Sequence, residues 1–200
     1  MVEDRRIREA ADMELVSRCQ RGDTQAFNEL VNQYRGKVYA MIYNMIHNEQ
    51  DAWDLTQDGF LKAWKSMGRF QGQSAFYTWL YRIVMNSTID WMRQRKIAGE
   101  GEFDEECSLG QVDARATTVP HSDPLPFQKM ERDEIRKRID AAVDQLSPEH
   151  RAVIVMREMD GMPYDEIAAV LDCSTGTVMS RLFYARKKLQ SALRDLYEAI

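Results

Sequence analysis

The side chains best suited to chemistry lie in the segment from Tyr164 to Leu182. Its pattern predicts a short helix, a three-residue turn and a second helix, which is the helix-turn-helix plan. Ser174 is placed to cap the second helix, whose free N–H groups would then favour a DNA phosphate. Five polar side chains remain for a DNA groove: Thr175, Thr177, Ser180, Arg181 and Tyr184. A plain helical hairpin with a solvated basic face is the alternative interpretation.

A second group of residues alternates aromatic rings with cations. The rings are Phe70, Phe76, Tyr77, Trp79, Tyr81 and Trp91, and the cations are Arg69, Arg82, Arg93, Arg95 and Lys96. Aromatic faces stack unpaired bases while cations follow the phosphate backbone, so this composition is typical of single-strand binding. We expect Phe76, Leu80 and Ile83 to be core residues, which leaves Tyr77 and Trp79 for stacking.

No constellation typical of an enzyme is present. The sequence has no phosphate-binding glycine loop, no HExxH motif, no nucleophile elbow and no histidine near a candidate nucleophile. The three cysteines form no CxxC pair and lie at no metal-ligand spacing from the histidines. We therefore predict a protein that is not an enzyme and holds no metal or other cofactor, with Cys19 and Cys173 as small buried hydrophobes.

The net charge of −5 is distributed unevenly along the chain. Residues 1–98 hold 14 Lys/Arg against 12 Asp/Glu, residues 99–127 hold one against seven, and residues 128–200 hold 12 against 13. The stretch 173–194 nevertheless contains five cations and no acid. This division favours a protein that contacts DNA with one patch and another protein with others.

Helical periodicity divides the chain into three parts, and no segment has the period of a strand. Residues 12–97 form the first predicted domain. Its first helix is expected to be capped by Asp23 or Thr24 and to run to the break at residues 48–50. Two more are expected from about Asp51 to Met67 and from near Ser74 to the basic end at residues 93–96. Periodicity alone leaves any small helical bundle as an alternative.

Residues 98–127 are expected to be a flexible linker, because they are acidic, contain glycine and proline, and have no helical period. The second domain, 128–200, begins with the apolar stripe Ile135, Ile139, Ala142, Val143 and Leu146. Further helices are expected from Ser147 to Asp160, from Tyr164 to Leu171 and from Thr175 to about Tyr197. The predicted fold is therefore all-α, with two small helical domains joined by a linker.

Several motifs resemble those of extracytoplasmic-function sigma factors of the sigma-70 superfamily. Leu146–Arg151, Tyr164–Ala168 and Gly176–Leu182 are similar to the family's region 4. Asp54–Trp64 resembles its polymerase-binding helix, and Phe76–Ile83, with Asn86 and Asp90, resembles its promoter-melting helix. The three motifs stand in the family's order.

The resemblance implies an alternative sigma factor that binds core RNA polymerase, reads −35 duplex DNA and melts the −10 element. It places polymerase binding on Asp51, Asp54, Gln57 and Asp58. It places −10 binding on Gln71, Gly72, Gln73, Ser74, Tyr77, Trp79, Arg82 and Asn86, with residues 71–74 as a pocket for a flipped base. It places −35 binding on Ser174, Thr175, Thr177, Met179, Ser180, Arg181, Phe183, Tyr184, Arg186 and Lys187.

Two residues depart from the family pattern. Trp53 stands where the family usually has an acid, so the edge of the polymerase contact is open. Met179 stands where the family often has a basic residue, and methionine does not donate to a guanine edge. The −35 sequence therefore does not follow from the family average.

The implied partners are core polymerase, promoter DNA as duplex and as melted strand, and an anti-sigma factor. The chain shows no membrane-spanning run and no signal peptide, so a cytoplasmic location is expected. Two rival interpretations stay open. One is a free-standing transcription regulator that uses the same C-terminal module, and the other is an anti-sigma-like adaptor that only mimics these surfaces.

Overall fold

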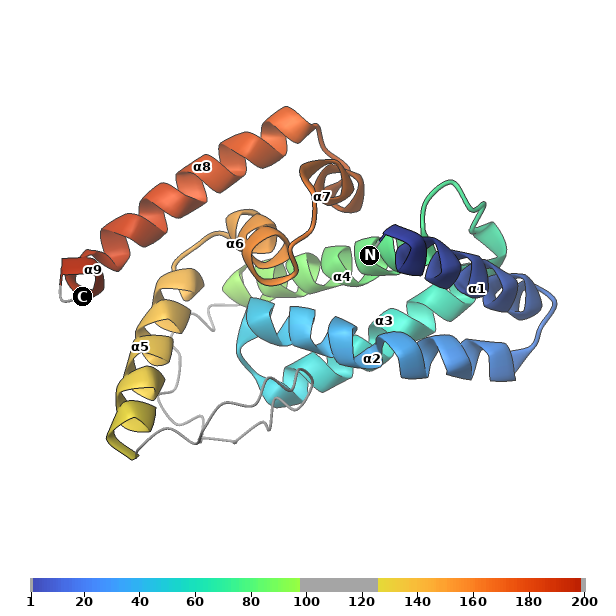
Figure 1. Ribbon diagram of the computed structural model, residues 1–200, viewed down its shortest axis with the longest axis horizontal. Helices are drawn as coiled ribbons and strands as arrows, with labels where there is room; N and C mark the ends of the chain where they lie inside the picture. Colours follow the sequence, from blue (N-terminus) through green and yellow to red (C-terminus); the bar gives the residue numbers. More distant parts are fainter. Residues whose placement is uncertain (1, 98–125, 199–200) are drawn as a thin grey trace.

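The computed structural model describes residues 2–97 and 126–198, and all regular structure within them is helical (Figure 1). This confirms the predicted all-α fold with two helical parts. The linker expected at 98–127 lies almost entirely outside the described residues. No helix within the described ranges is long and apolar enough to cross a membrane.

Four helices make the N-terminal part: α1 (Val2–Gln20), α2 (Thr24–Ile46), α3 (Glu49–Ser66) and α4 (Phe76–Ile97). Asp23 caps α2 as expected, since its carboxylate accepts from the N–H groups of the next helix. The break before α3 is shorter than predicted, because His47 takes a left-handed conformation (φ 49°) and Asn48 already caps α3. Helix α4, which the sequence placed from near Ser74, begins at Phe76.

Helix α1 begins before the expected domain boundary at residue 12 and is hydrogen-bonded to the rest of the bundle at two places. Asp12 is buried and bonds Gln33 and the Tyr34 hydroxyl of α2. At the other end, the Gln20 amide donates to the carbonyl oxygens of Met67 and Phe70, at 3.1 and 2.9 Å. These bonds hold the start of the connection between α3 and α4.

Helices α3 and α4 approach each other closely at Gly59. A Cβ atom there would lie 2.7 Å from Cγ2 of Val84, which is shorter than ordinary packing allows. Glycine at this position therefore sets the distance between the two helices that carry the predicted polymerase-binding and −10 residues.

The C-terminal part contains α5 (Pro126–Asp144), α6 (Pro148–Ile154), the π-helical turn η2 (Val155–Met159), α7 (Tyr164–Leu171), α8 (Thr175–Ala192) and α9 (Arg194–Glu198). Two expectations need correction. The helix that starts after the Ser147 cap changes to a π turn before it ends at Asp160. The long last helix is interrupted at Leu193 rather than continuing to Tyr197.

The predicted apolar stripe of α5 is buried only at its C-terminal end. Ala142, Val143 and Leu146 are buried, whereas Ile135 is half-buried and Ile139 is exposed. Only this end of the predicted apolar stripe packs into the core, so Ile139 remains exposed although it belongs to the stripe.

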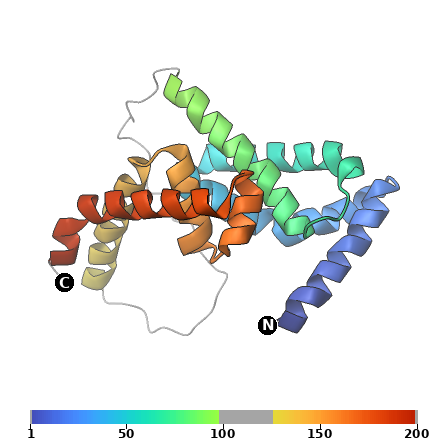
Figure 2. The same ribbon diagram turned by 90° about the horizontal axis from the view of Figure 1, so that it is seen from above.

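The two helical parts share one apolar core in the structure. Helices α6 and α7 lie against α4, and η2 lies near α2 (Figures 1 and 2). The buried cluster is continuous from Val84 and Met85 on α4 to Ile154, Met156 and Ile167 of the C-terminal part. Apolar burial therefore holds the two parts together as well as each part by itself.

Arg151 of α6 lies at the centre of this junction and is only 5% exposed. Its Nη1 donates to the carbonyl oxygen of Met45 on α2 at 2.6 Å and lies 2.7 Å from an Asp144 carboxylate oxygen. The same oxygen of Asp144 lies 3.0 Å from Nδ1 of His47. A buried cation is tolerated when it is paired and hydrogen-bonded, so this cluster fixes α6 on the end of α2.

Three further polar contacts cross the junction: Arg93 with Glu149 at 2.6 Å, Arg82 with Asp172 at 3.3 Å, and the Tyr81 hydroxyl with Asp160 at 3.3 Å.

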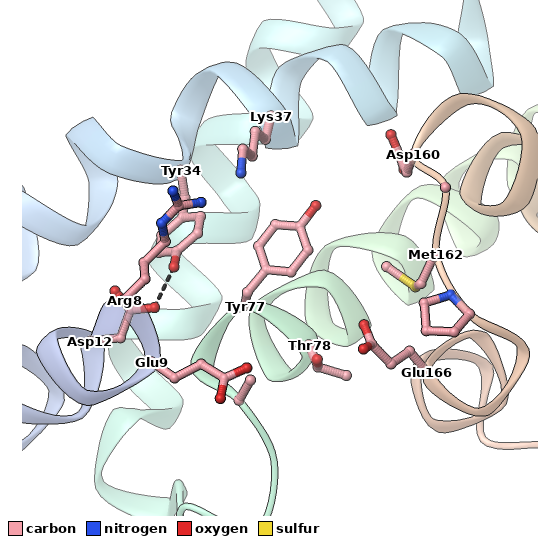
Figure 3. Close-up of a pocket in the computed structure, with 13 residues that line it drawn as sticks. Arg8, Glu9, Asp12, Tyr34, Lys37, Tyr77, Thr78, Asp160, Met162 and Glu166 are labelled. Carbon is pink, nitrogen blue, oxygen red and sulfur yellow. Dashed lines mark hydrogen bonds between the residues drawn. The ribbon is translucent and has the colours of Figure 1, made fainter. Parts of the chain in front are cut away.

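A pocket of about 330 Å³ lies along the same junction, between α1, α2, α4 and the loop before α7. Figure 3 shows Tyr77 reaching into it, with Lys37 on one side and Asp160 on another. Removal from water raises the pKa of Asp160 to about 6, although the Tyr81 hydroxyl and Lys37 act in the opposite direction. The carboxyl group is therefore easier to protonate in the folded chain.

This shift predicts a pH-dependent contribution to stability. The folded-state pKa of Asp160 lies above its ordinary value, so the folded chain binds the proton more tightly. The free energy of unfolding then falls as pH rises from about 4 to about 6, and stays lower above that. The removal of the Asp160 carboxyl group from water is incomplete, because part of the residue stays exposed, and the remaining contact with solvent reduces the effect.

We expect Asp160→Asn to stabilise the chain at pH 7 and to have little effect at pH 4. Urea denaturation of both proteins at several pH values measures the difference. Asp165→Asn, a change of the same kind at an exposed carboxylate of α7, is the control. A difference for Asp160→Asn that does not change with pH would contradict the assignment.

Candidate nucleic-acid interface

The helix-turn-helix predicted from the sequence is formed by α7, a turn and α8. Asp172 takes a left-handed conformation (φ 51°) that ends α7, and Ser174 caps α8 by accepting from the Thr177 N–H at 3.1 Å. Ile167, Val178 and Leu182 are buried between the helices, whereas Leu171 is only partly buried. The local sequence thus packs α8 on α7 in the way that a helix-turn-helix requires of its second helix.

Most predicted −35 residues lie on the exposed side of α8. Ser174, Thr175, Met179, Ser180, Phe183, Tyr184, Arg186 and Lys187 are exposed, while Thr177 and Arg181 are half-buried. Two of the hydroxyl groups already bond each other, since Ser174 Oγ and Thr177 Oγ1 lie 2.9 Å apart. The structure therefore groups these ten residues around one helix.

The cations of α8 differ in their surroundings. Arg186 pairs with Glu158 of η2 at 2.5 Å, and the hydrogen bond to that carboxylate raises the pKa of Arg186. Lys188 donates to the carbonyl oxygen of Gln145. Among the described residues, Lys187 is exposed and has no ion pair, so it is the cation of this helix most readily offered to a phosphate.

The predicted −10 residues of α4 fall on two different sides of the helix. Trp79, Arg82 and Asn86 are spaced by three and four residues and share one face. Tyr77 lies about 200° around the helix from Trp79, at about 100° per residue. The two rings chosen for base stacking therefore do not form one platform.

The surroundings of the two rings differ accordingly. Tyr77 lies 4.3 Å from the ring of Tyr81 and 5.4 Å from that of Tyr34, and Lys37 lies over its face at 5.5 Å. Burial raises the pKa of Tyr77 to about 12. Trp79 instead packs on Phe70 at 4.9 Å. Both rings are half-buried, so each keeps part of its surface for another contact.

The predicted base pocket, residues 71–74, is an exposed loop beside Trp79. Gln73 donates to the Gln71 side chain at 3.0 Å, which orders the two amides. Gly72 has φ 70°, and a Cβ atom there would lie 3.0 Å from Cε of Met13 on α1. Glycine is favoured at this turn because other residues rarely take this conformation.

Three of the four predicted polymerase-binding residues lie together on the open side of α3. Asp54, Gln57 and Asp58 are exposed, and the exposed Leu61 continues the same face by helical spacing. The sequence interpretation missed Leu61, although its position i+7 from Asp54 would have revealed it.

Asp51 is partly withdrawn from that face, since its carboxylate pairs with Arg95 of α4 at 2.6 Å. Trp53, which departs from the family pattern, stacks on Tyr39 of α2 at 4.4 Å. The ring therefore contributes to packing at the edge of the acidic face.

Within the described residues, no group of three or more His, Cys, Asp or Glu side chains is placed to hold a metal ion. Cys19 is buried and Cys173 is half-buried, broadly as expected, and Cys107 lies outside the described residues. Burial raises the pKa of the Cys19 thiol, which favours the neutral form.

The junction brings the two predicted DNA-binding surfaces together. Arg82, on the −10 face of α4, pairs with Asp172, which directly precedes Cys173 and the Ser174 cap of α8. A predicted −10 residue is therefore bonded to the turn that directly precedes the predicted −35 helix.

Comparison with known proteins identifies the family of the two helical parts. The Sigma-70 region 2 family model matches residues 30–97, and the Sigma-70, region 4 model matches residues 136–189. The chain is 37% identical over 188 residues to the RNA polymerase sigma-H factor of Pseudomonas aeruginosa, covering 92% of this chain and 95% of that protein. It is 34% identical to the ECF RNA polymerase sigma-E factor of Escherichia coli K12, with the same coverage.

Two solved structures share the fold across both helical parts. One is CnrH in complex with the cytosolic domain of CnrY, with a TM-score of 0.65 and 26% identity over 92% of this chain and 98% of that one. The other is RpoE of Bartonella quintana in complex with the anti-sigma factor NepR, with a TM-score of 0.62 and 25% identity over 84% and 96%. Sigma factors are initiation factors rather than enzymes, in agreement with the sequence prediction. The chain belongs to the sigma-70 family of RNA polymerase sigma factors, as a member of its extracytoplasmic-function group.

Proposed function

We propose that this protein binds core RNA polymerase through α3, reads −35 duplex DNA through α8, and melts the −10 element on the surface around α4. The observation that carries the proposal is α8 itself. It is capped by Ser174, packed on α7, exposed along its outer side, and free of acidic residues from 173 to 194. Such a helix suits the major groove of a polyanion.

Polymerase binding is assigned to the exposed face of Asp54, Gln57, Asp58 and Leu61. Carboxylates and an amide beside one apolar side chain suit a basic partner surface that has an apolar centre. The −10 element is assigned to the loop 71–74 and to the face of Trp79, Arg82 and Asn86. Tyr77 would join this surface only if the C-terminal part moves away from it.

With α6 and α7 packed against α4, the chain cannot bind the −35 and −10 elements of one promoter at the same time. The −35 and −10 elements are separated by about 25 base pairs, or roughly 85 Å at 3.4 Å per base pair. Arg82 and Asp172 lie 3.3 Å apart. We propose that the junction opens when the chain joins polymerase, and that the residues between the helical parts then span the gap.

An anti-sigma factor is the proposed inhibitory partner, because the structurally similar sigma factor RpoE was solved in complex with the anti-sigma factor NepR. The proposed location is the bacterial cytoplasm, where core polymerase and promoters are found.

Reconstitution tests the function. The purified chain, added to sigma-free core polymerase and genomic DNA, should start transcripts at a limited set of sites with shared upstream sequences. A free-standing regulator would bind duplex DNA without polymerase and start no transcripts, and an adaptor would do neither.

The polymerase face predicts a charge effect in the same assay. Asp54→Lys with Asp58→Lys should weaken core binding at least about tenfold, since like charges across an interface are unfavourable. Fluorescence anisotropy with labelled protein measures the affinity. Glu14→Lys with Glu134→Lys makes the same charge change at other exposed acids. Equal losses for both pairs would show that only overall charge matters.

Strand opening should depend on the aromatic residues of α4. Each base restacked on an aromatic ring returns about 1–3 kcal/mol, so losing Tyr77 and Trp79 together should make the open complex rare. Polymerase binding and −35 recognition should change little. Permanganate reactivity of −10 thymines measures opening, and a premelted bubble template should restore much of the activity.

Because the two rings lie on opposite sides of α4, the single variants identify which surface stacks the bases. Tyr43→Ala, which truncates another half-buried ring, is the control, and circular dichroism checks folding. Normal opening of duplex DNA by the folded double variant would assign both rings to the core.

A further inference from the structure

Helix α8 exposes an unusual amount of apolar surface at positions that are assigned here to −35 DNA binding. Met179, Phe183 and Tyr184 are 54%, 62% and 61% exposed. They are three of the nine large apolar side chains exposed in the described part of the chain, and they occupy less than two turns of one helix. Met179 and Phe183 also line a shallow groove of about 400 Å³ that continues to Lys187 and Gln190.

Polar groups that could read guanine are scarce on the same stretch. Arg181 is its one cation before Arg186, and it is half-buried. Arg186 is held by Glu158. Ser180 Oγ is turned back toward the Thr177 carbonyl oxygen, at 3.4 Å. Guanine is read in the major groove by donors, most often a bidentate Arg or Lys, and neither methionine nor phenylalanine is a donor.

The major groove offers one apolar feature, which is the C5 methyl group of thymine. A flexible thioether chain beside a rigid ring suits such a methyl group, because methionine adapts to irregular apolar surfaces. The absence of acids between 173 and 194 keeps the surrounding surface compatible with phosphates. Contact with thymine methyl groups in the major groove would therefore remove these exposed apolar side chains from water.

We propose that Met179 and Phe183 determine −35 specificity by contacting thymine methyl groups, so that this sigma factor prefers −35 elements with thymines at the contacted positions. The inference rests on the proposed function, because it requires that α8 enters the major groove of the −35 element.

The experiment uses the full chain bound to core polymerase and a library of promoters with a randomised −35 element. The bound fraction should be enriched in thymine at one or more fixed positions. Each enriched thymine is then replaced by deoxyuridine, which removes the C5 methyl group and leaves every hydrogen-bonding group in place.

We expect each contacted methyl group to contribute about fourfold to binding, the factor that corresponds to about 0.8 kcal/mol for a buried methylene-sized group. Met179→Ala with Phe183→Ala should abolish the difference between thymine and deoxyuridine. Met159→Ala, which truncates an exposed methionine outside α8, should preserve it. Met179→Arg should shift the selected base toward guanine.

The possible outcomes distinguish failure of the methyl-reading inference from failure of the proposed sigma function. Selection of a −35 motif without any deoxyuridine effect overturns the methyl-reading inference and leaves the sigma function standing. Failure of the holoenzyme to select any −35 motif overturns both. Unchanged DNA selection by the double variant would assign the apolar patch to a protein partner instead, and would also overturn the inference.

Discussion

The seating of α6 on the end of α2 depends on one buried cation at the junction of the two helical parts. Arg151 joins α6 to the last turn of α2 through the Met45 carbonyl oxygen and is paired with Asp144. Removing one partner of a buried ion pair commonly costs about 3–5 kcal/mol, because the remaining charge is left unpaired. Nε of Arg151 has no hydrogen-bond partner among the described residues, so the cluster is held by fewer bonds than the guanidinium could make. Such a junction is specific in geometry without being as stable as an apolar core of the same size.

The same junction places the two proposed DNA-binding surfaces close together. It also packs the apolar cluster around Ile154 and Ile167 against α4 and pairs Arg82 with Asp172. Tyr77 then becomes the wall of a pocket that also contains Asp160 (Figure 3). Helix α8 keeps its outer side exposed, whereas Tyr77, one of the predicted −10 residues, is half-buried.

Local features of this fold could be predicted from the sequence, because each depends on neighbouring residues. The caps Asp23, Ser147 and Ser174 formed as expected, and α7 has the predicted bounds. The opposite orientation of Tyr77 and Trp79 also follows from their spacing, although composition alone suggested one stacking surface.

The junction could not be predicted in this way. Met45 and Arg151 are 106 residues apart, and nothing in either segment indicates that a carbonyl oxygen of one accepts from the other. The exposure of Ile139 has the same origin, since it depends on which end of α5 reaches the core. Periodicity predicts which face of a helix is apolar, but the tertiary contacts decide how much of that face is covered.

The distance between the two helical parts tests this account most directly. Spin labels at Gln94 on α4 and Ser191 on α8, both exposed, can be attached to cysteines after the native cysteines are replaced by alanine. Double electron–electron resonance of the free chain should give one short, narrow distance, and Arg151→Ala should broaden it. In the complex with core polymerase and promoter DNA the distance should increase by tens of ångströms, as the roughly 85 Å between promoter elements requires. The same short distance in a transcribing complex would contradict the proposed opening.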